Sequence, residues 1–91
     1  MSSERDVLIC NAKGLHARAA AQFVKTVGLF SATVTVTRDG TVADGRSVMN
    51  LLILAAPKGS TITIQATGDD AEAAMEALVR LVENGFGEDH D

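Results

Sequence analysis

A histidine and an arginine stand two residues apart where the sequence predicts that a helix begins. Gly14 interrupts the chain after an apolar run, and His16 follows just before a helical pattern that extends to residue 27. Backbone N–H groups in the first turn of a helix have no partner within the helix, and the helix dipole also favours an anion there. Arg18 adds a guanidinium that can bond two phosphate oxygens at once. These features predict an anion site beside His16.

The imidazole of His16 adds a nucleophile to this site. An imidazole keeps an unprotonated ring nitrogen near neutral pH, and that nitrogen can attack phosphorus and carry the group covalently. Other roles stay open, since a lone histidine is commonly structural or simply exposed, and a dyad with a Ser or Cys is not excluded by spacing. A zinc site would need further ligands, and the other histidine, His90, lies near the chain end. The residues alone favour phosphate or anion handling without excluding a structural histidine.

The composition predicts one small domain with an aliphatic core. The 91 residues are 46% hydrophobic and 22% charged, which is typical of a folded globular chain rather than a disordered one. Three Phe and no Trp or Tyr leave little surface for stacking on bases, and a net charge of −4 disfavours binding to a phosphate backbone. We therefore expect no nucleic-acid partner.

The cysteine content and the hydropathy predict a cytoplasmic protein. The single cysteine, Cys10, cannot form an internal disulfide, and within its apolar run we expect it to be a small buried side chain. No stretch approaches the roughly 20 apolar residues of a membrane span. The first six residues are too polar for a secretion signal. We expect no membrane insertion.

Seven elements are predicted in the order β-α-β-β-α-β-α. The strands are expected at 7–10, 32–37, 41–43 and 61–66, and the helices at 17–27, at 48–54 and after Asp70. The apolar run 7–10 is interpreted as a central strand, whereas 32–37 and 61–66 alternate apolar and polar residues. Asp39-Gly40 is expected to form the hairpin turn. Such alternation predicts a sheet with one wet face and one face covered by helices.

Each predicted helix has an expected cap or an expected buried face. Ser47 is expected to cap the helix 48–54, and Asp69, with Glu72 as the reciprocal partner, the last helix. The expected inward-facing residues are Ala17, Ala20, Ala21, Val24 and Val27 in the first helix, Leu51 and Leu54 in the second, and Ala71, Ala74, Met75, Leu78, Leu81 and Val82 in the third. Gly85 is expected to end the last helix, and 87–91 to form a frayed acidic tail without a role.

The segment Gly14-Leu15-His16-Ala17-Arg18, with 20–25 after it, resembles the active-site signature of HPr, the histidine phosphocarrier of the bacterial phosphotransferase system. The resemblance extends over nearly the whole chain and implies a single HPr-like domain, residues 1–91. It implies an α+β fold, an open-faced β-sandwich with a four-stranded antiparallel sheet of order 1-4-2-3 and three helices on one face. One departure is Ala19, where many members have a proline that would pre-set the first helical turn.

The resemblance also implies roles for individual residues. His16 would accept a phosphoryl group, on the ring nitrogen nearer the backbone, from phosphoenolpyruvate-dependent enzyme I and pass it to an enzyme IIA. Arg18 and the backbone amides of Ala17 and Arg18 would stabilise the phosphate, and Ser47 would be a regulatory site for an HPr kinase/phosphorylase. The residues expected at the partner interface are Leu15, Ala21, Val48, Met49 and Leu52, the last three as an exposed apolar patch. A monomeric stoichiometric carrier, without metal or cofactor, is expected rather than a true enzyme.

Two branches of this family and two other classes of protein remain to be distinguished. The segments 47–54, 58–59, 66–68 and 84–86 look more like the nitrogen-related carrier, and we favour that branch, whereas 20–25 matches the sugar-transport carrier. A non-catalytic interaction module acting through the face of Ser47, and a small-ligand-binding regulatory domain, remain as alternatives. An enzyme acting on a free substrate is disfavoured, because the chain offers one suitable titratable group where hydrolytic chemistry needs several.

Overall fold

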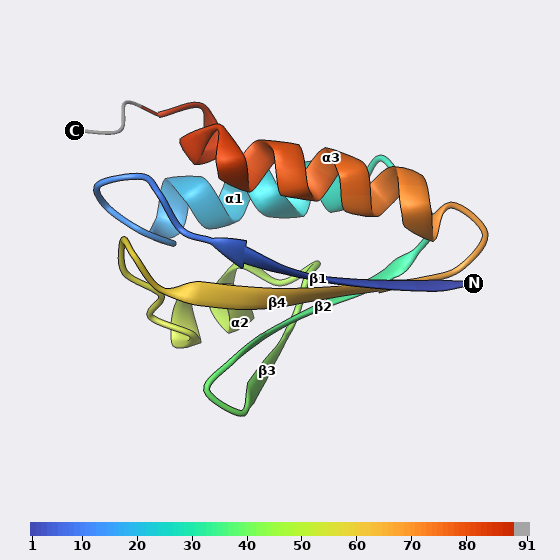
Figure 1. Cartoon of the computed structure of the whole chain (residues 1–91), viewed down its shortest axis with the longest axis horizontal. Helices are drawn as coiled ribbons and strands as arrows, with labels where there is room; N and C mark the ends of the chain where they lie inside the picture. The colour runs from blue at the N-terminus through green and yellow to red at the C-terminus, as the bar shows by residue number, and fades with distance from the viewer. Residues whose placement is uncertain (89–91) are drawn as a thin grey trace.

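The computed structural model describes residues 1–88 and contains one antiparallel sheet covered on one face by helices (Figure 1). In chain order the elements are β1 (Ser2–Leu8), α1 (Ala17–Val27), β2 (Thr33–Arg38), β3 (Thr41–Asp44), α2 (Val48–Ile53), β4 (Thr61–Thr67), α3 (Ala71–Glu83) and the short 3₁₀ helix η1 (Gly85–Gly87). The strand order β1-β4-β2-β3 confirms the expected sheet. Helices α1 and α3 lie side by side over the sheet, and α2 contacts α1 and β3. Within residues 1–88, no helix has the length and apolar character needed to span a bilayer.

Strands β2 and β4 have the alternating sequences, and each buries one face against the core as predicted. Their inward-facing residues, Ala32, Val34, Val36, Ile62, Ile64 and Ala66, are all buried. The turn between β2 and β3 places Asp39 at φ 49° and Gly40 at φ 83°. Two successive positive φ angles match the right-handed twist of a hairpin, which explains the Asp-Gly pair. The predicted hairpin is confirmed.

The prediction for β1 was wrong in extent and in position. The strand runs over Ser2–Leu8 and lies at the edge of the sheet, paired with β4 from Ser2↔Thr67 to Leu8↔Thr61. Its polar residues suit an edge strand because they bond across to β4: Thr63 donates to Asp6 at 2.7 Å and Gln65 to Glu4 at 2.6 Å. The apolar run 7–10 led to the wrong strand limits because it continues past the end of β1. Ile9 is buried although it lies beyond the strand, and Cys10 is only half-buried rather than buried as expected.

The predicted buried face of α1 is confirmed for Ala20 and Val27 and in part for Val24, which packs half-buried against the core, but it was wrong for Ala17 and Ala21. The side chains that face the core are Ala19, Ala20, Phe23 and Val27, while Ala17 and Ala21 are exposed. Alanines occur on both sides of this helix, so their spacing does not identify the inner face. Phe23 is the largest buried side chain and determines the orientation.

The predicted cap of α2 is confirmed, whereas the predicted cap of α3 was wrong. Ser47 caps α2, since its hydroxyl accepts a hydrogen bond from the backbone N–H of Asn50 at 3.1 Å. Asp70, not Asp69, precedes α3, and it makes no side-chain cap bond to that helix. The predicted core residues of both helices are buried, except that Leu81 is half-buried, and Gly85 follows the end of α3 as expected.

The carboxylate of Asp70 joins the start of β2 to the start of α3. It accepts backbone hydrogen bonds from Ser31 and Ala32, both at 2.8 Å. The bond from Ser31 is the largest cause of a lowered pKa for Asp70; burial acts in the opposite direction, and the bond from Ala32 lowers the pKa further.

We predict that Asp70→Asn lowers the free energy of unfolding, because an amide is a weaker acceptor for these two N–H groups. A carboxyl whose pKa is lowered by folding stabilises the fold above its unfolded-state pKa, and that contribution is lost as the pH falls through the folded-state value. Urea unfolding at pH 7 and at progressively lower pH should therefore show a difference between parent and variant that shrinks on acidification. Asp69→Asn, at an exposed neighbour, is the control; equal effects of the two variants would contradict the assignment.

Candidate active site

His16 is the residue that precedes the first turn of α1. Its backbone is extended (φ −87°, ψ −176°), its carbonyl accepts from the N–H of Ala20 at 2.8 Å, and its Nδ1 accepts from the N–H of Arg18 at 3.3 Å. The side chain is 26% exposed. The predicted position of His16 at a helix start, open to solvent, is confirmed.

The loop before His16 is fixed by a close backbone contact at Gly14. This residue has φ +66°, and a Cβ added to it would lie 2.4 Å from the carbonyl oxygen of Ala56. The N–H of Leu15 donates to the same oxygen at 2.8 Å. Leu15 itself is 5% exposed and belongs to the core, so the expectation that it lies at a partner interface was wrong. Its burial anchors the residue next to His16.

Glu88 contacts the ring of His16 from the far end of the chain. Its Oε2 lies 2.6 Å from Nε2 of His16, and its Oε1 accepts from Nδ2 of Asn11 at 2.9 Å. Asn11 is fully buried, and the same Nδ2 also donates to the carbonyl of Gly14 at 2.8 Å. We did not predict a role for Glu88 or Asn11. No local spacing could have identified Glu88, because 72 residues separate it from His16.

A left-handed turn brings Glu88 to this position. Gly85, Phe86 and Gly87 have φ angles of 64°, 58° and 79°, and Phe86 is buried. A bulky residue with positive φ is strained, so the surrounding packing must hold it there. The expectation of a frayed tail from residue 87 is therefore wrong for Gly87 and Glu88; residues 89–91 lie outside the described residues.

The partners of the two ring nitrogens indicate that Nε2 carries a proton. Nδ1 accepts a backbone N–H and so presents its lone pair, while Nε2 carries the proton and donates it to a carboxylate. Burial acts to raise the pKa of Glu88, but the hydrogen bonds from Asn11 and His16 and the attraction of His16 and Arg18 outweigh it, and the pKa is lowered. Glu88 is thus ionised at neutral pH.

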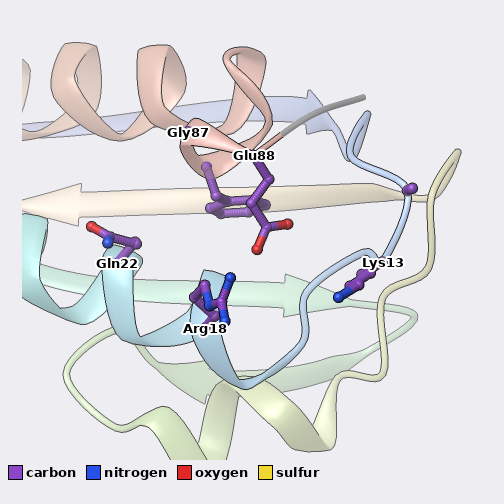
Figure 2. Close-up of a pocket in the computed structure, with 7 residues that line it drawn as sticks. Lys13, Arg18, Gln22, Gly87 and Glu88 are labelled. Atoms are coloured by element: carbon purple, nitrogen blue, oxygen red, sulfur yellow. The ribbon is translucent and has the colours of Figure 1, made fainter. Parts of the chain in front are cut away.

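A cleft of about 470 Å³ lies beside Glu88, and the side chains of Arg18 and Lys13 also line it (Figure 2). The cleft is lined by Ala12, Lys13, Arg18, Gln22, Phe86, Gly87 and Glu88. Figure 2 shows Arg18 below the Glu88 carboxylate and Lys13 to its right. Among residues 1–88, no three His, Cys, Asp or Glu side chains are grouped so that they could hold a metal ion. The site is therefore suited to an anion beside Arg18 and the start of α1.

The exposed apolar side chains of α2 differ in part from the predicted patch. Met49 is 71% exposed as expected, but Val48 and Leu52 are half-buried against the core. Ile53, which was not predicted, is 69% exposed. Residues four apart lie on one side of a helix, so Met49 and Ile53 share the outer face while Val48 and Leu52 turn inward. We call Met49 and Ile53 the α2 patch.

Known proteins match this chain over nearly its full length. The family model described as "PTS HPr component phosphorylation site" matches residues 3–84. The phosphocarrier protein HPr of Cupriavidus necator is 44% identical over 85 residues, which cover 93% of this chain and 96% of its own. The phosphocarrier protein NPr of Shewanella violacea is 42% identical over 85 residues, with 93% of each chain covered.

A solved structure shares the fold as well. The crystal structure of HPr-C-His from Thermoanaerobacter tengcongensis superposes with a TM-score of 0.91 at 40% identity, covering 96% of this chain and 98% of the other. The chain belongs to the HPr family of phosphotransferase-system phosphocarriers. The sequence resemblance is thereby confirmed. Ala19, in place of the common proline, is fully buried in the first turn of α1, and the helix still begins at Ala17.

We predict that Gly14→Ala lowers the free energy of unfolding by more than about 2 kcal/mol, because a left-handed backbone alone costs an L-residue roughly 1–2 kcal/mol and the new Cβ would overlap the Ala56 carbonyl. Urea denaturation measures this loss. Gly40→Ala is the matched control, since Gly40 has φ +83° but nothing lies within 4 Å of its added Cβ. A smaller loss at Gly14 than at Gly40 would refute the importance of the close contact.

Proposed function

We propose that the protein accepts a phosphoryl group on Nδ1 of His16 from a phosphoenolpyruvate-dependent enzyme I and passes it to an enzyme IIA. The observation that carries the proposal is the orientation of the ring. Nδ1 faces the start of α1, where its lone pair accepts one long hydrogen bond of 3.3 Å from the Arg18 N–H, while Nε2 is engaged by Glu88 at 2.6 Å. The family assignment supports the same chemistry.

The transfer is an in-line displacement at phosphorus. The Nδ1 lone pair forms the N–P bond, the bond between phosphorus and the donor breaks, and its electron pair returns to the donor. A phosphoryl oxygen then takes the place of Nδ1 as acceptor of the Arg18 N–H. Further stabilisation comes from the N–H of Ala17 and from the Arg18 guanidinium, since the product carries a charge near −2.

The carrier must also release the group. Full enclosure of the phosphate by cations would make it too stable to pass on. Arg18 is exposed and the His16 ring stays open to solvent, so the phosphoryl group is only partly neutralised. An exposed site also lets the next protein reach phosphorus from the side opposite the nitrogen.

The α2 patch is the proposed docking surface for both partners, together with the exposed Ala21 of α1. Exposed apolar side chains such as Met49 and Ile53 favour protein contact, and α1 and α2 touch each other. Ser47 precedes the patch and caps α2. A phosphate placed on Ser47 by an HPr kinase/phosphorylase would meet the helix N-terminus, so it would change the charge of the docking surface with little change in fold.

For the branch, we propose the nitrogen-related relay on the basis of segments 47–54, 58–59, 66–68 and 84–86. The sugar-transport relay is the alternative, supported by segment 20–25. Identities of 44% to an HPr and 42% to an NPr do not separate the two. The enzyme I that loads the protein is the property that distinguishes them.

We predict that one enzyme I, with phosphoenolpyruvate, adds a single acid-labile phosphate to the parent protein, detected by intact mass. His16→Ala should accept none, because the nucleophile is gone. Arg18→Ala should be loaded about tenfold more slowly or worse, as when one stabilising group is removed from a transition state. Lys25→Ala, an exposed cation at the other end of α1, should load at the parent rate. Loading of His16→Ala would overturn the proposal, and the nitrogen-type or sugar-type enzyme I that succeeds identifies the branch.

We predict that Met49→Asp and Ser47→Asp each weaken binding to that enzyme I about tenfold, because a charge is placed in an apolar contact or beside it. Titration calorimetry measures the affinity. Val42→Asp, at an exposed apolar residue on β3, is the control and should bind like the parent. Unchanged affinity for both α2 variants would remove the α2 patch from the docking surface.

A further inference from the structure

The C-terminal turn and a buried asparagine converge on the side of the His16 ring that does not attack phosphorus. Glu88 Oε2 lies 2.6 Å from Nε2, and Glu88 Oε1 is held by Asn11 at 2.9 Å. The side chain of Glu88 is 18% exposed, less than that of His16. This carboxylate is therefore fixed in place by two bonds rather than freely solvated.

Within residues 1–88, the side-chain oxygen of Asn11 is left without a hydrogen bond in this arrangement. Its Nδ2 donates both to Glu88 and to the Gly14 carbonyl, while its Oδ1 is buried and has no hydrogen-bond partner within the described residues. Exchanging the amide oxygen and nitrogen would place an oxygen against two acceptors, so the orientation is determined. A buried unsatisfied oxygen is costly and needs an explanation. The explanation offered by the contacts is that Asn11 ties the His16 loop and Glu88 together.

Phe86 adds a second strained feature to the same unit. It is buried with φ 58°, between two glycines that also have positive φ. Because Phe86 lies two residues before Glu88, its packing sets where the carboxylate points. The strained backbone of Phe86 and the unsatisfied Oδ1 of Asn11 therefore belong to the same unit, which holds Glu88 against His16.

We propose that Glu88, held by Asn11, is a positioning residue that orients His16 and stabilises the positive charge that develops on its ring during phosphoryl transfer; this inference rests on the proposed function. As the Nδ1 lone pair forms the N–P bond and the donor keeps the electron pair of the broken bond, the proton stays on Nε2 and the ring becomes cationic. The Glu88 carboxylate forms an ion pair with that ring. It does so without occupying the Nδ1 side, where the helix-start N–H groups receive the phosphoryl oxygens.

The test compares Glu88→Gln with the parent protein and with Glu83→Gln. Gln keeps the size of Glu88 and an oxygen acceptor but removes the charge, and Glu83→Gln removes an exposed charge at the same end of α3. Loading of Glu88→Gln should be about tenfold slower, since charge-assisted hydrogen bonds are roughly twice as strong as neutral ones and a factor of ten in rate corresponds to about 1.4 kcal/mol. Glu83→Gln should load at the parent rate.

Two phosphoryl donors are compared, so that an effect of Glu88 on the His16 ring can be distinguished from an effect on the docking of enzyme I. Loading is measured with enzyme I and phosphoenolpyruvate and, in a second arm, with phosphoramidate, a small donor that needs no docking surface. A positioning role predicts the same loss in both arms. A loss with enzyme I alone would place Glu88 in the docking surface and overturn the inference.

A spectroscopic measurement tests the contact without any phosphate. In protein labelled with ¹⁵N-histidine, the Nε2–H proton of His16 should be far downfield and slow to exchange, and both properties should be lost in Glu88→Gln but not in Glu83→Gln. Asn11→Leu removes the bond to the Gly14 carbonyl as well as the bond to Glu88, so it should reduce the loading rate of the parent by a larger factor than that of Glu88→Gln. Urea denaturation checks that each variant is folded. Parent-like loading and spectra for Glu88→Gln would overturn the inference, whereas a parent protein that takes no phosphate would overturn the proposed function instead.

Discussion

The contact between Gly14 and the Ala56 carbonyl determines where α1 begins and hence what His16 can do. The left-handed backbone at Gly14 allows the loop to lie directly against the chain after α2, and the Leu15 N–H bonds the same oxygen. Leu15 then enters the core. With the two residues before it fixed, His16 lies at the helix start, where its Nδ1 accepts from the N–H of Arg18. Under the proposed function, a small shift of this loop would move His16 away from the groups that stabilise the phosphoryl group.

The features predicted correctly from sequence are those that depend on neighbouring residues. The start of α1 follows from Gly14, the hairpin from Asp39-Gly40, and the cap of α2 from Ser47. Each of these signals lies within a few residues of the feature it predicts, although the contact with Ala56 that holds Gly14 in place is not visible in the sequence. The alternation in β2 and β4 identified the buried face for the same reason.

The errors occurred where the answer depends on distant parts of the chain. The alanines of α1 fit either side of the helix, and only the packing of Phe23 in the assembled core selects one. Asp70 bonds the backbone of residues 31–32 instead of its own helix, a contact that no capping pattern predicts. Glu88 is the clearest case, because an acidic residue near a chain end looks solvated until the left-handed turn at Phe86 places it on His16.

A carboxylate beside a phosphate-accepting histidine has opposite effects on the two states of a carrier. Before transfer it fixes the ring and favours the cation that forms as Nδ1 attacks. After transfer the same negative charge lies near a phosphoryl group with a charge near −2 and repels it. In the proposed phosphorylated state, Arg18 and Lys13, which line the same cleft as Glu88, would offset part of that repulsion without surrounding the phosphate. Under the proposed function, balanced charges of this kind would leave the phosphorylated state no more stable than a relay requires.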